Sequence, residues 1–311
     1  MIETHNLVKW YGPTLAVDRL SFQIPPGQIV GFLGPNGAGK TTTLRIVTGY
    51  MPPTSGRAVV ANFNVLTESR AARSRIGYMP EASPLYPEMR IDEYLHFRGK
   101  LHGMNRTDRV RRIDELCARC GLDQVRRRVI GHLSKGNRQR VGMVQALLHD
   151  PPVIILDEPT SGLDPLQIVQ IRHLLEELRQ DHTILLSSHT LTEIERVADR
   201  IMIIRKGRLV ADGTTDELCA RARGDARITV VVMANSGVLK TELAKIEGIR
   251  QIETTPHDGW CHATVVPANG ADVREPILAA VTAQGWRVRE IKRREVNLED
   301  YYLQLFRELD E

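Results

Sequence analysis

The chain has 311 residues, of which 42% are hydrophobic and 26% are charged, and its formal net charge at pH 7 is +4. This length predicts two domains, or one large and one small domain. No run approaches the roughly 20 apolar residues of a membrane-spanning helix, and residues 1–5 lack the basic and then apolar order of a signal peptide. We therefore expect a soluble, cytosolic protein.

The first 24 residues predict two strands around a turn at Gly12 and Pro13. Tyr11 lies where the chain reverses, so its ring could offer a flat face to a nucleotide base. The alternative, which this residue taken alone favours, is an aromatic side chain packed on the core at the hairpin end.

A phosphate-binding loop follows. Residues 29–33 are a short apolar run that predicts a buried strand, and a helix with apolar residues at Leu44 and Val47 begins after residue 41. Between them, residues 34–41 read Gly-Pro-Asn-Gly-Ala-Gly-Lys-Thr and fit the P-loop pattern G-x-x-x-x-G-K-[ST]. The predicted nucleotide-binding residues here are Gly34, Pro35, Asn36, Gly37, Ala38, Gly39, Lys40, Thr41 and Thr42.

The chemistry of this loop follows from its backbone. The three glycines can adopt conformations closed to other residues, so that successive N–H groups point into one hollow. The helix N-terminus adds partial positive charge at the same place. Lys40 would bring a full charge to the outer phosphates, and the Thr41 hydroxyl is placed to bind magnesium.

The middle of the chain predicts a helical insert at about residues 88–149, with helices near 91–102, 106–120 and 135–149. Residues 98–140 carry 13 Lys and Arg against 4 Asp and Glu. Such a basic face could meet anionic lipid, nucleic acid or only water. Cys117 and Cys120 form a C-x-x-C pair without a second ligand pair, so we expect two buried thiols rather than a zinc or redox site.

Two carboxylates end the next predicted strand. Residues 153–156 are continuously apolar, as in a strand buried on both faces, and Asp157 and Glu158 follow at its carboxyl end, where open α/β sheets bind ligands. We expect Asp157 to bind magnesium and Glu158 to polarise the attacking water. The alternative of a helix cap or surface turn fits poorly beside a P-loop. His189 ends another buried strand and could hydrogen-bond a γ-phosphate, although a lone histidine is more often structural.

The composition changes at residues 221–225, which predict a linker. Beyond it the predicted order is strand, helix, strand, strand, helix, strand and a final helix. That βαββαβ order predicts a small ferredoxin-like α+β domain over residues 225–311. We identify no catalytic constellation in it.

Over residues 1–219 these motifs together resemble the ATP-binding subunit of an ABC transporter. The motifs are the aromatic Tyr11, Walker A at residues 34–42, a signature at 133–140, Walker B at 153–158, a D-loop at 161–164 and the switch histidine His189. The sequence Tyr-Met-Pro-Glu at residues 78–81 and the signature Leu-Ser-Lys-Gly-Asn look like the exporter class that carries a C-terminal appendage. That class includes drug, antibiotic, gliding-motility and copper-maturation transporters. The sequence departs from the family pattern in two motifs: Glu81 stands where Gln is usual, and Lys135 and Asn137 alter the usual LSGGQ.

The resemblance implies an α/β P-loop ATPase that uses ATP and Mg²⁺ and works as a head-to-tail dimer. ATP would lie between the P-loop of one copy and the signature of the other, with Tyr11 on the adenine. The implied roles are catalysis by Glu158, His189 and Lys40, magnesium binding by Thr41, Asp157 and Glu81, and nucleotide contact from the opposite copy by Ser134, Gly136, Asn137 and Asp164.

The implied partners are a separate transmembrane permease and a second ATP-binding subunit. The protein would then lie on the cytoplasmic face of the membrane, with its basic insert towards the permease and the anionic lipid surface, and without nucleic acid. The alternative function is a soluble ABC ATPase that acts on ribosomes or DNA. Such proteins usually carry two ATPase domains or a long coiled coil, and neither is present in this sequence.

Overall fold

The computed structural model describes residues 1–221, 227–268, 271–294 and 297–308. The chain divides into two compact units, Met1–Thr214 and Thr215–Glu311. Throughout the described residues, no helix combines the length and the apolar character that crossing a membrane requires.

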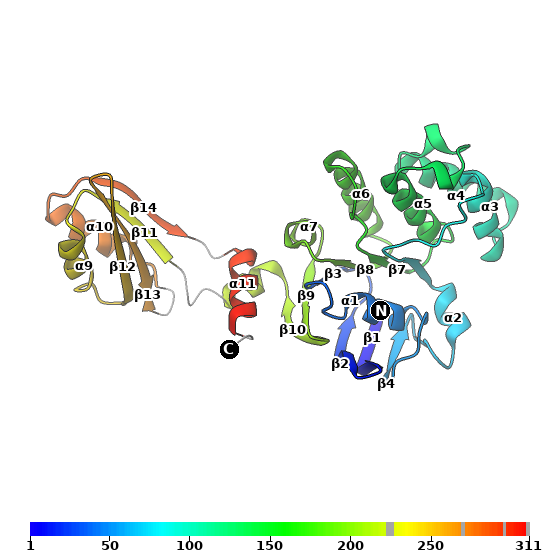
Figure 1. Cartoon of the computed structure of the whole chain (residues 1–311), viewed down its shortest axis with the longest axis horizontal. Coiled ribbons are helices and arrows are strands. Elements are labelled where there is room, and N and C mark those ends of the chain that lie inside the picture. The colour runs from blue at the N-terminus through cyan, green and yellow to red at the C-terminus, as the bar shows by residue number, and fades with distance from the viewer. Residues whose placement is uncertain (222–226, 269–270, 295–296, 309–311) are drawn as a thin grey trace. The chain divides into compact units, whose positions relative to one another are not determined.

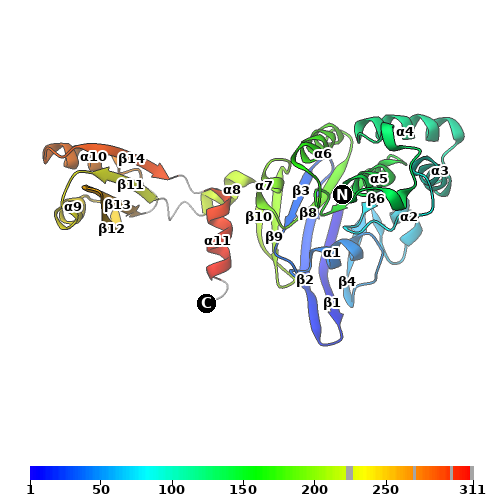
Figure 2. The ribbon, with the colours of Figure 1, turned by 45° about the horizontal axis from the view of Figure 1, so that its top comes forward.

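The first unit begins with an antiparallel sheet of order β2-β1-β4-β5. Figure 2 shows β1 and β2 as a long hairpin. One face of this sheet is apolar, and its alternate residues, such as Leu7 and Leu20, are fully or almost fully buried. The strands are β1 (Ile2–Tyr11), β2 (Thr14–Ile24), β4 (Ser55–Val60) and β5 (Phe63–Asn64).

The second sheet of this unit has the order β10-β9-β3-β8-β7-β6. Its strands pair in parallel except for β10, which is antiparallel to β9. Strands β3, β7 and β8 are buried along their whole length, which explains their continuous apolar sequences. The strands are β3 (Ile29–Leu33), β6 (Ile76–Met79), β7 (Val153–Asp157), β8 (Thr183–Ser188), β9 (Arg200–Arg205) and β10 (Arg208–Gly213).

Helix α1 (Lys40–Val47) joins the two sheets, because its buried residues Leu44, Ile46 and Val47 share one core with residues of both. The P-loop therefore lies between β3 and a helix that is anchored on two sides. The short helix α2 (Ser69–Ser74) follows β5. The sequence analysis assigned no element to that segment.

The helical insert is present as expected and lies on one side of the unit (Figure 1). It contains α3 (Ile91–Leu101), α4 (Arg106–Arg119) and α5 (Lys135–Leu147). Helix α6 (Pro165–Leu178) follows β7, and α7 (Leu191–Glu195) follows β8. The Asn105, Ser134 and Asp164 side chains cap α4, α5 and α6 by accepting a backbone N–H three residues later.

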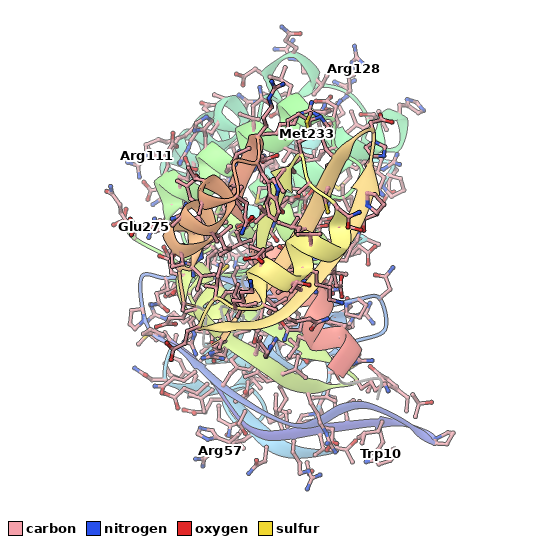
Figure 3. The ribbon with its side chains drawn as sticks, turned by 90° about the vertical axis from the view of Figure 1, so that its left-hand side faces the viewer. Trp10, Arg57, Arg111, Arg128, Met233 and Glu275 are labelled. Carbon is pink, nitrogen blue, oxygen red and sulfur yellow. The ribbon has the colours of Figure 1, made fainter. Side chains whose placement is uncertain are left out.

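Much of the positive charge of the insert is neutralised within the unit. Arg126 pairs with Asp92 at 2.8 Å and with Asp114 at 2.7 Å. Arg119 pairs with Glu177 at 2.7 Å. Arg111 and Arg128 are exposed and lie at the outer surface of the insert (Figure 3). The basic face is therefore smaller than the sequence count indicates.

The second unit contains a four-stranded antiparallel sheet of order β12-β13-β11-β14. Helices α9 and α10 share one core with it, through Leu239, Leu243, Ile277 and Val281. The βαββαβ element order is the one that the sequence predicts. The elements are α8 (Thr215–Arg221), β11 (Arg227–Val232), α9 (Ser236–Leu243), β12 (Ile249–His257), β13 (Trp260–Pro267), α10 (Arg274–Ala283), β14 (Val288–Arg294) and α11 (Leu298–Glu308).

Candidate functional site

A cavity of about 590 Å³ opens at the P-loop. Its walls come from the hairpin end of the first sheet, the P-loop and α1, the segment after β6, and the carboxyl ends of β7 and β8. Most of the predicted site residues of the P-loop motif meet here. The lining residues are Tyr11, Ala16, Pro35, Asn36, Gly37, Gly39, Lys40, Thr41, Thr42, Glu81, Glu158 and His189.

The P-loop glycines have two different roles. Gly37 and Gly39 have φ values of +79° and +104°, which side-chain-bearing residues rarely adopt. Gly34 is different from the sequence expectation, because its φ is not positive. A Cβ at Gly34 would lie 2.4 Å from the Ile204 carbonyl oxygen, so glycine is needed for close packing against β9.

Lys40 is almost buried, at 6% exposure, and its ammonium lies at the floor of the cavity. It donates hydrogen bonds to the carbonyl oxygens of Gly34 at 2.6 Å and Pro35 at 3.3 Å. The Glu158 Oε1 atom lies 3.6 Å away. The P-loop therefore holds a positive charge in fixed position where an anionic group can enter.

Asp157, which directly precedes the cavity residue Glu158, is fully buried and does not itself line the cavity. Its Oδ1 accepts a 2.6 Å hydrogen bond from Ser187 Oγ, whereas Oδ2 has no hydrogen-bond partner in the described part of the chain. A buried carboxylate oxygen without a partner is costly, and a hard divalent cation satisfies it well. Thr41 and Glu81, which line the cavity, carry oxygen donors of the same hard type, so the chemistry of these residues fits Mg²⁺.

Glu158 and His189 face one another at the same edge of the sheet. Glu158 is 7% exposed, and its Oε2 lies 2.8 Å from His189 Nδ1. The Glu158 main chain has φ +51°, a left-handed conformation that costs about 1–3 kcal/mol in a non-glycine residue. Strain of this kind is retained where the surroundings fix a side chain in a required direction.

Tyr11 is 44% exposed and lines the cavity, so its ring is accessible. Its hydroxyl donates to Met51 Sδ at 3.1 Å, and the Lys9 ammonium lies 5.5 Å from the ring centroid. Lys9 is itself held by a 2.7 Å hydrogen bond to the Pro52 carbonyl oxygen. Sequence reasoning missed Lys9, Met51 and Ala16. Met51 reaches Tyr11 across 40 residues of sequence, whereas Lys9 lies only two residues from Tyr11 but no motif marks it.

The predicted residues of the signature and the D-loop do not line this cavity within one chain: Ser134, Gly136, Asn137 and Asp164. Gly34, Ala38 and Asp157 do not line it either, but they adjoin residues that do. Ser134 Oγ accepts from the Asn137 N–H at 3.3 Å, and Asp164 Oδ1 accepts from the Gln167 N–H at 2.9 Å. Gly136 packs closely against α6, because a Cβ there would lie 2.7 Å from Gln167 Oε1. The chain therefore carries two separate groups of predicted nucleotide-binding residues.

A second cavity, of about 650 Å³, lies between α1, β6 and the helical insert. The His102 and His149 rings stack there with centroids 3.8 Å apart. Burial, and then the positive charge of His102, lowers the pKa of His149 to about 4. Arg73 and Arg98 also line this second cavity, which we call the basic groove. Its other lining residues are Thr48, Gly49, Tyr50, Ile76, Tyr78, Pro80, Pro84, Gln145 and Ala146.

Cys117 and Cys120 are buried and unpaired, in agreement with the sequence analysis. Burial raises the pKa of both thiols to about 12. Within the described residues, no group of three or more His, Cys, Asp or Glu side chains is arranged to hold a metal ion.

A family model described as ABC transporter matches residues 17–161. The linearmycin resistance ATP-binding protein LnrL of Bacillus subtilis (strain 168) is 33% identical over 311 residues, which cover 98% of each chain. The chain belongs to the ABC transporter ATP-binding proteins.

Two further likenesses extend this assignment. The bacitracin transport ATP-binding protein BcrA of Bacillus licheniformis is 39% identical over 225 residues, 72% of each chain. The dimeric post-hydrolysis structure of the ATP-binding cassette MJ0796 with ADP and Pi has a TM-score of 0.64 and 25% identity. It covers 69% of this chain and 98% of that one. This ABC protein is therefore an ATP-binding P-loop ATPase.

Proposed function

We propose that the chain is the ATP-hydrolysing motor subunit of an ABC exporter and acts as a head-to-tail dimer. The observation that carries this proposal is the separation of Ser134, Gly136 and Asp164 from the P-loop cavity. A second copy turned head to tail would bring its signature group to the P-loop of the first, as closed two-fold assemblies allow. The two copies would then complete two equivalent sites.

Each composite site would hold ATP by charge and stacking. The Tyr11 ring would stack on the adenine, while the P-loop N–H groups and Lys40 would bind the phosphates. Thr41, Asp157 and Glu81 would hold Mg²⁺, which neutralises phosphate charge when it is bound. Ser134, Gly136, Asn137 and Asp164 of the second copy would close the site around the γ-phosphate.

Glu158 would accept a proton from the attacking water at a carboxylate oxygen. His189, whose Nδ1 lies 2.8 Å from Glu158 Oε2, would orient that carboxylate and hydrogen-bond the γ-phosphate. Phosphoryl transfer requires mainly positioning and charge neutralisation, which these groups supply. Closure of the dimer on ATP and its opening after hydrolysis would drive the membrane subunit.

The groove beside His102 and His149 is a candidate docking site for the membrane subunit. It lies between the ATPase core and the insert, and Arg73 and Arg98 make it basic. Exposed residues of the insert, such as Arg128, would face the anionic lipid surface. The protein would then sit peripherally on the cytoplasmic face of the membrane, with residues 225–311 as an accessory domain.

The transporter function is favoured over an ATPase that acts on ribosomes or DNA, because the relatives named above carry resistance and transport functions. Affinity purification from membranes and from ribosome fractions separates the two. We expect co-purification with a membrane protein, and Glu158→Gln should trap an ATP-bound dimer on size-exclusion chromatography. Co-sedimentation with ribosomes or DNA alone would contradict the transporter function.

A further inference from the structure

The strained main chain of Glu158 takes part in four hydrogen bonds. Its N–H donates to Ser187 Oγ at 3.0 Å and towards the Ser187 carbonyl oxygen at 3.2 Å. Its carbonyl oxygen accepts from Gln139 Nε2 at 3.0 Å and from the Ser161 N–H at 3.1 Å. Because φ is +51° at a residue with a side chain, the direction of the carboxylate depends on these bonds.

The two side-chain partners, Ser187 and Gln139, come from different parts of the unit. Ser187 lies on β8, next to the strand that carries Glu158, so it moves with the sheet. Gln139 lies on α5 of the helical insert and is 5% exposed. Its side-chain amide donates to the carbonyl oxygen of Glu158, and Gln139 is not among the residues that line the P-loop cavity or the cavity beside His102 and His149.

Helix α5 is also the helix that Ser134 caps. Gln139 lies five positions after Ser134, so the rise of a helix places them about 7.5 Å apart along its axis. Lys135 Nζ, in the first turn, lies 3.4 Å from Ser161 Oγ in the segment after Glu158. Because α5 is a rigid helix, a displacement of its N-terminal end also moves Gln139, and Gln139 is bonded to the main chain of Glu158.

We propose that Gln139 is a positioning residue that links α5, the helix whose N-terminal end carries the signature residues, to Glu158 of the same chain. Its amide keeps the Glu158 carbonyl in place and thereby fixes the direction of the catalytic carboxylate. This inference rests on the proposed role of Glu158 in hydrolysis. The side chain of Gln139 itself touches no phosphate or base.

The test uses Gln139→Met, which preserves size and removes the donor, and Gln139→Leu, which removes the donor with a branched apolar side chain. The control Gln170→Met removes a different hydrogen bond of α5, the 2.9 Å bond to Arg140, without touching Glu158. Misplacing a reacting group by about 1 Å can cost up to about 100-fold in rate. We expect kcat to fall about tenfold in both Gln139 variants, with KM for ATP changed by less than about twofold.

A double-mutant cycle distinguishes positioning from loss of structure. In a Glu158→Gln background, Gln139→Met should cause no further loss of residual single-turnover hydrolysis, because the group that Gln139 positions is already gone. The same fold-loss in both backgrounds would overturn the inference, and so would parental kcat in both Gln139 variants. If the protein without substitutions did not hydrolyse ATP in this assay, that result would instead contradict the proposed function.

Discussion

Removal of the Ser187 hydroxyl is the sharpest test of how the two carboxylates of the site, Asp157 and Glu158, are held in place. This hydroxyl donates to Asp157 Oδ1 at 2.6 Å and accepts from the Glu158 N–H at 3.0 Å, and both contacts are buried. In Ser187→Ala the Asp157 carboxylate keeps no side-chain donor that this structure describes, because its Oδ2 already has no partner. The Glu158 N–H keeps only its longer contact of 3.2 Å to the Ser187 carbonyl oxygen.

The expected cost follows from hydrogen-bond energetics. A hydrogen bond to a charged group contributes about 1.5–3 kcal/mol, and an unsatisfied buried group adds a similar penalty that relaxation reduces. We expect Ser187→Ala to lower the unfolding free energy of the ATPase unit by about 2–3 kcal/mol. For a domain of this size, that corresponds to a fall in Tm of about 4–12 °C.

Differential scanning fluorimetry without nucleotide, and with ATP and Mg²⁺, measures this change. Magnesium should reduce the difference between variant and parent, because a bound cation supplies a partner for Asp157. Ser74→Ala is the control, since its hydroxyl forms a 2.8 Å bond to Ala71 on an exposed helix. A Tm for Ser187→Ala equal to that of the control, with or without magnesium, would refute this reasoning.

Three further predictions follow from the site and its surroundings. The pKa of His149 is lower in the folded protein, at about 4, than the unfolded value near 6.5, so the unfolded chain binds more protons in that window. Stability should therefore fall by up to about 3 kcal/mol as the pH drops from 6.5 to 4, and His149→Gln should flatten this slope in urea titrations; an identical slope would contradict it. Lys40→Ala should abolish ATP turnover in a phosphate-release assay, and turnover at the parental rate would refute its assignment. Cys117 and Cys120, whose thiol pKa values lie near 12, should resist iodoacetamide until the protein is denatured, and rapid native labelling detected by mass spectrometry would contradict their burial.

The sequence predicted the structure best where a short local pattern of residue types has one physical cause. The P-loop motif, the buried parallel strands β7 and β8 and the carboxylates at the carboxyl end of β7 were all predicted from local patterns. Helix α2 was missed because its six residues, Ser-Arg-Ala-Ala-Arg-Ser, show no apolar periodicity. Gly34 was placed in the correct motif, but the expected left-handed backbone is not why glycine is needed there. A Cβ at this position would clash with the Ile204 carbonyl oxygen of β9, a strand distant in the sequence.

The supporting residues could not be predicted because their signals are long-range. Ser187 and Gln139 lie 29 and 19 residues from Glu158, and each is an ordinary polar residue in its own strand or helix. The neutralisation of the basic insert depends likewise on tertiary pairs, such as Arg119 with Glu177. Only the fold brings these partners together.

Mixing two defective variants tests the shared nucleotide site most directly. Lys40→Ala disables the P-loop, and Ser134→Arg disables the signature, so each variant alone should be inactive. In an equal mixture, half of the dimers combine one copy of each and contain one intact site, so hydrolysis should recover to about a quarter of the parental rate if sites act independently. A mixture no more active than the two separate variants, despite exchange of subunits, would contradict a site built from two copies.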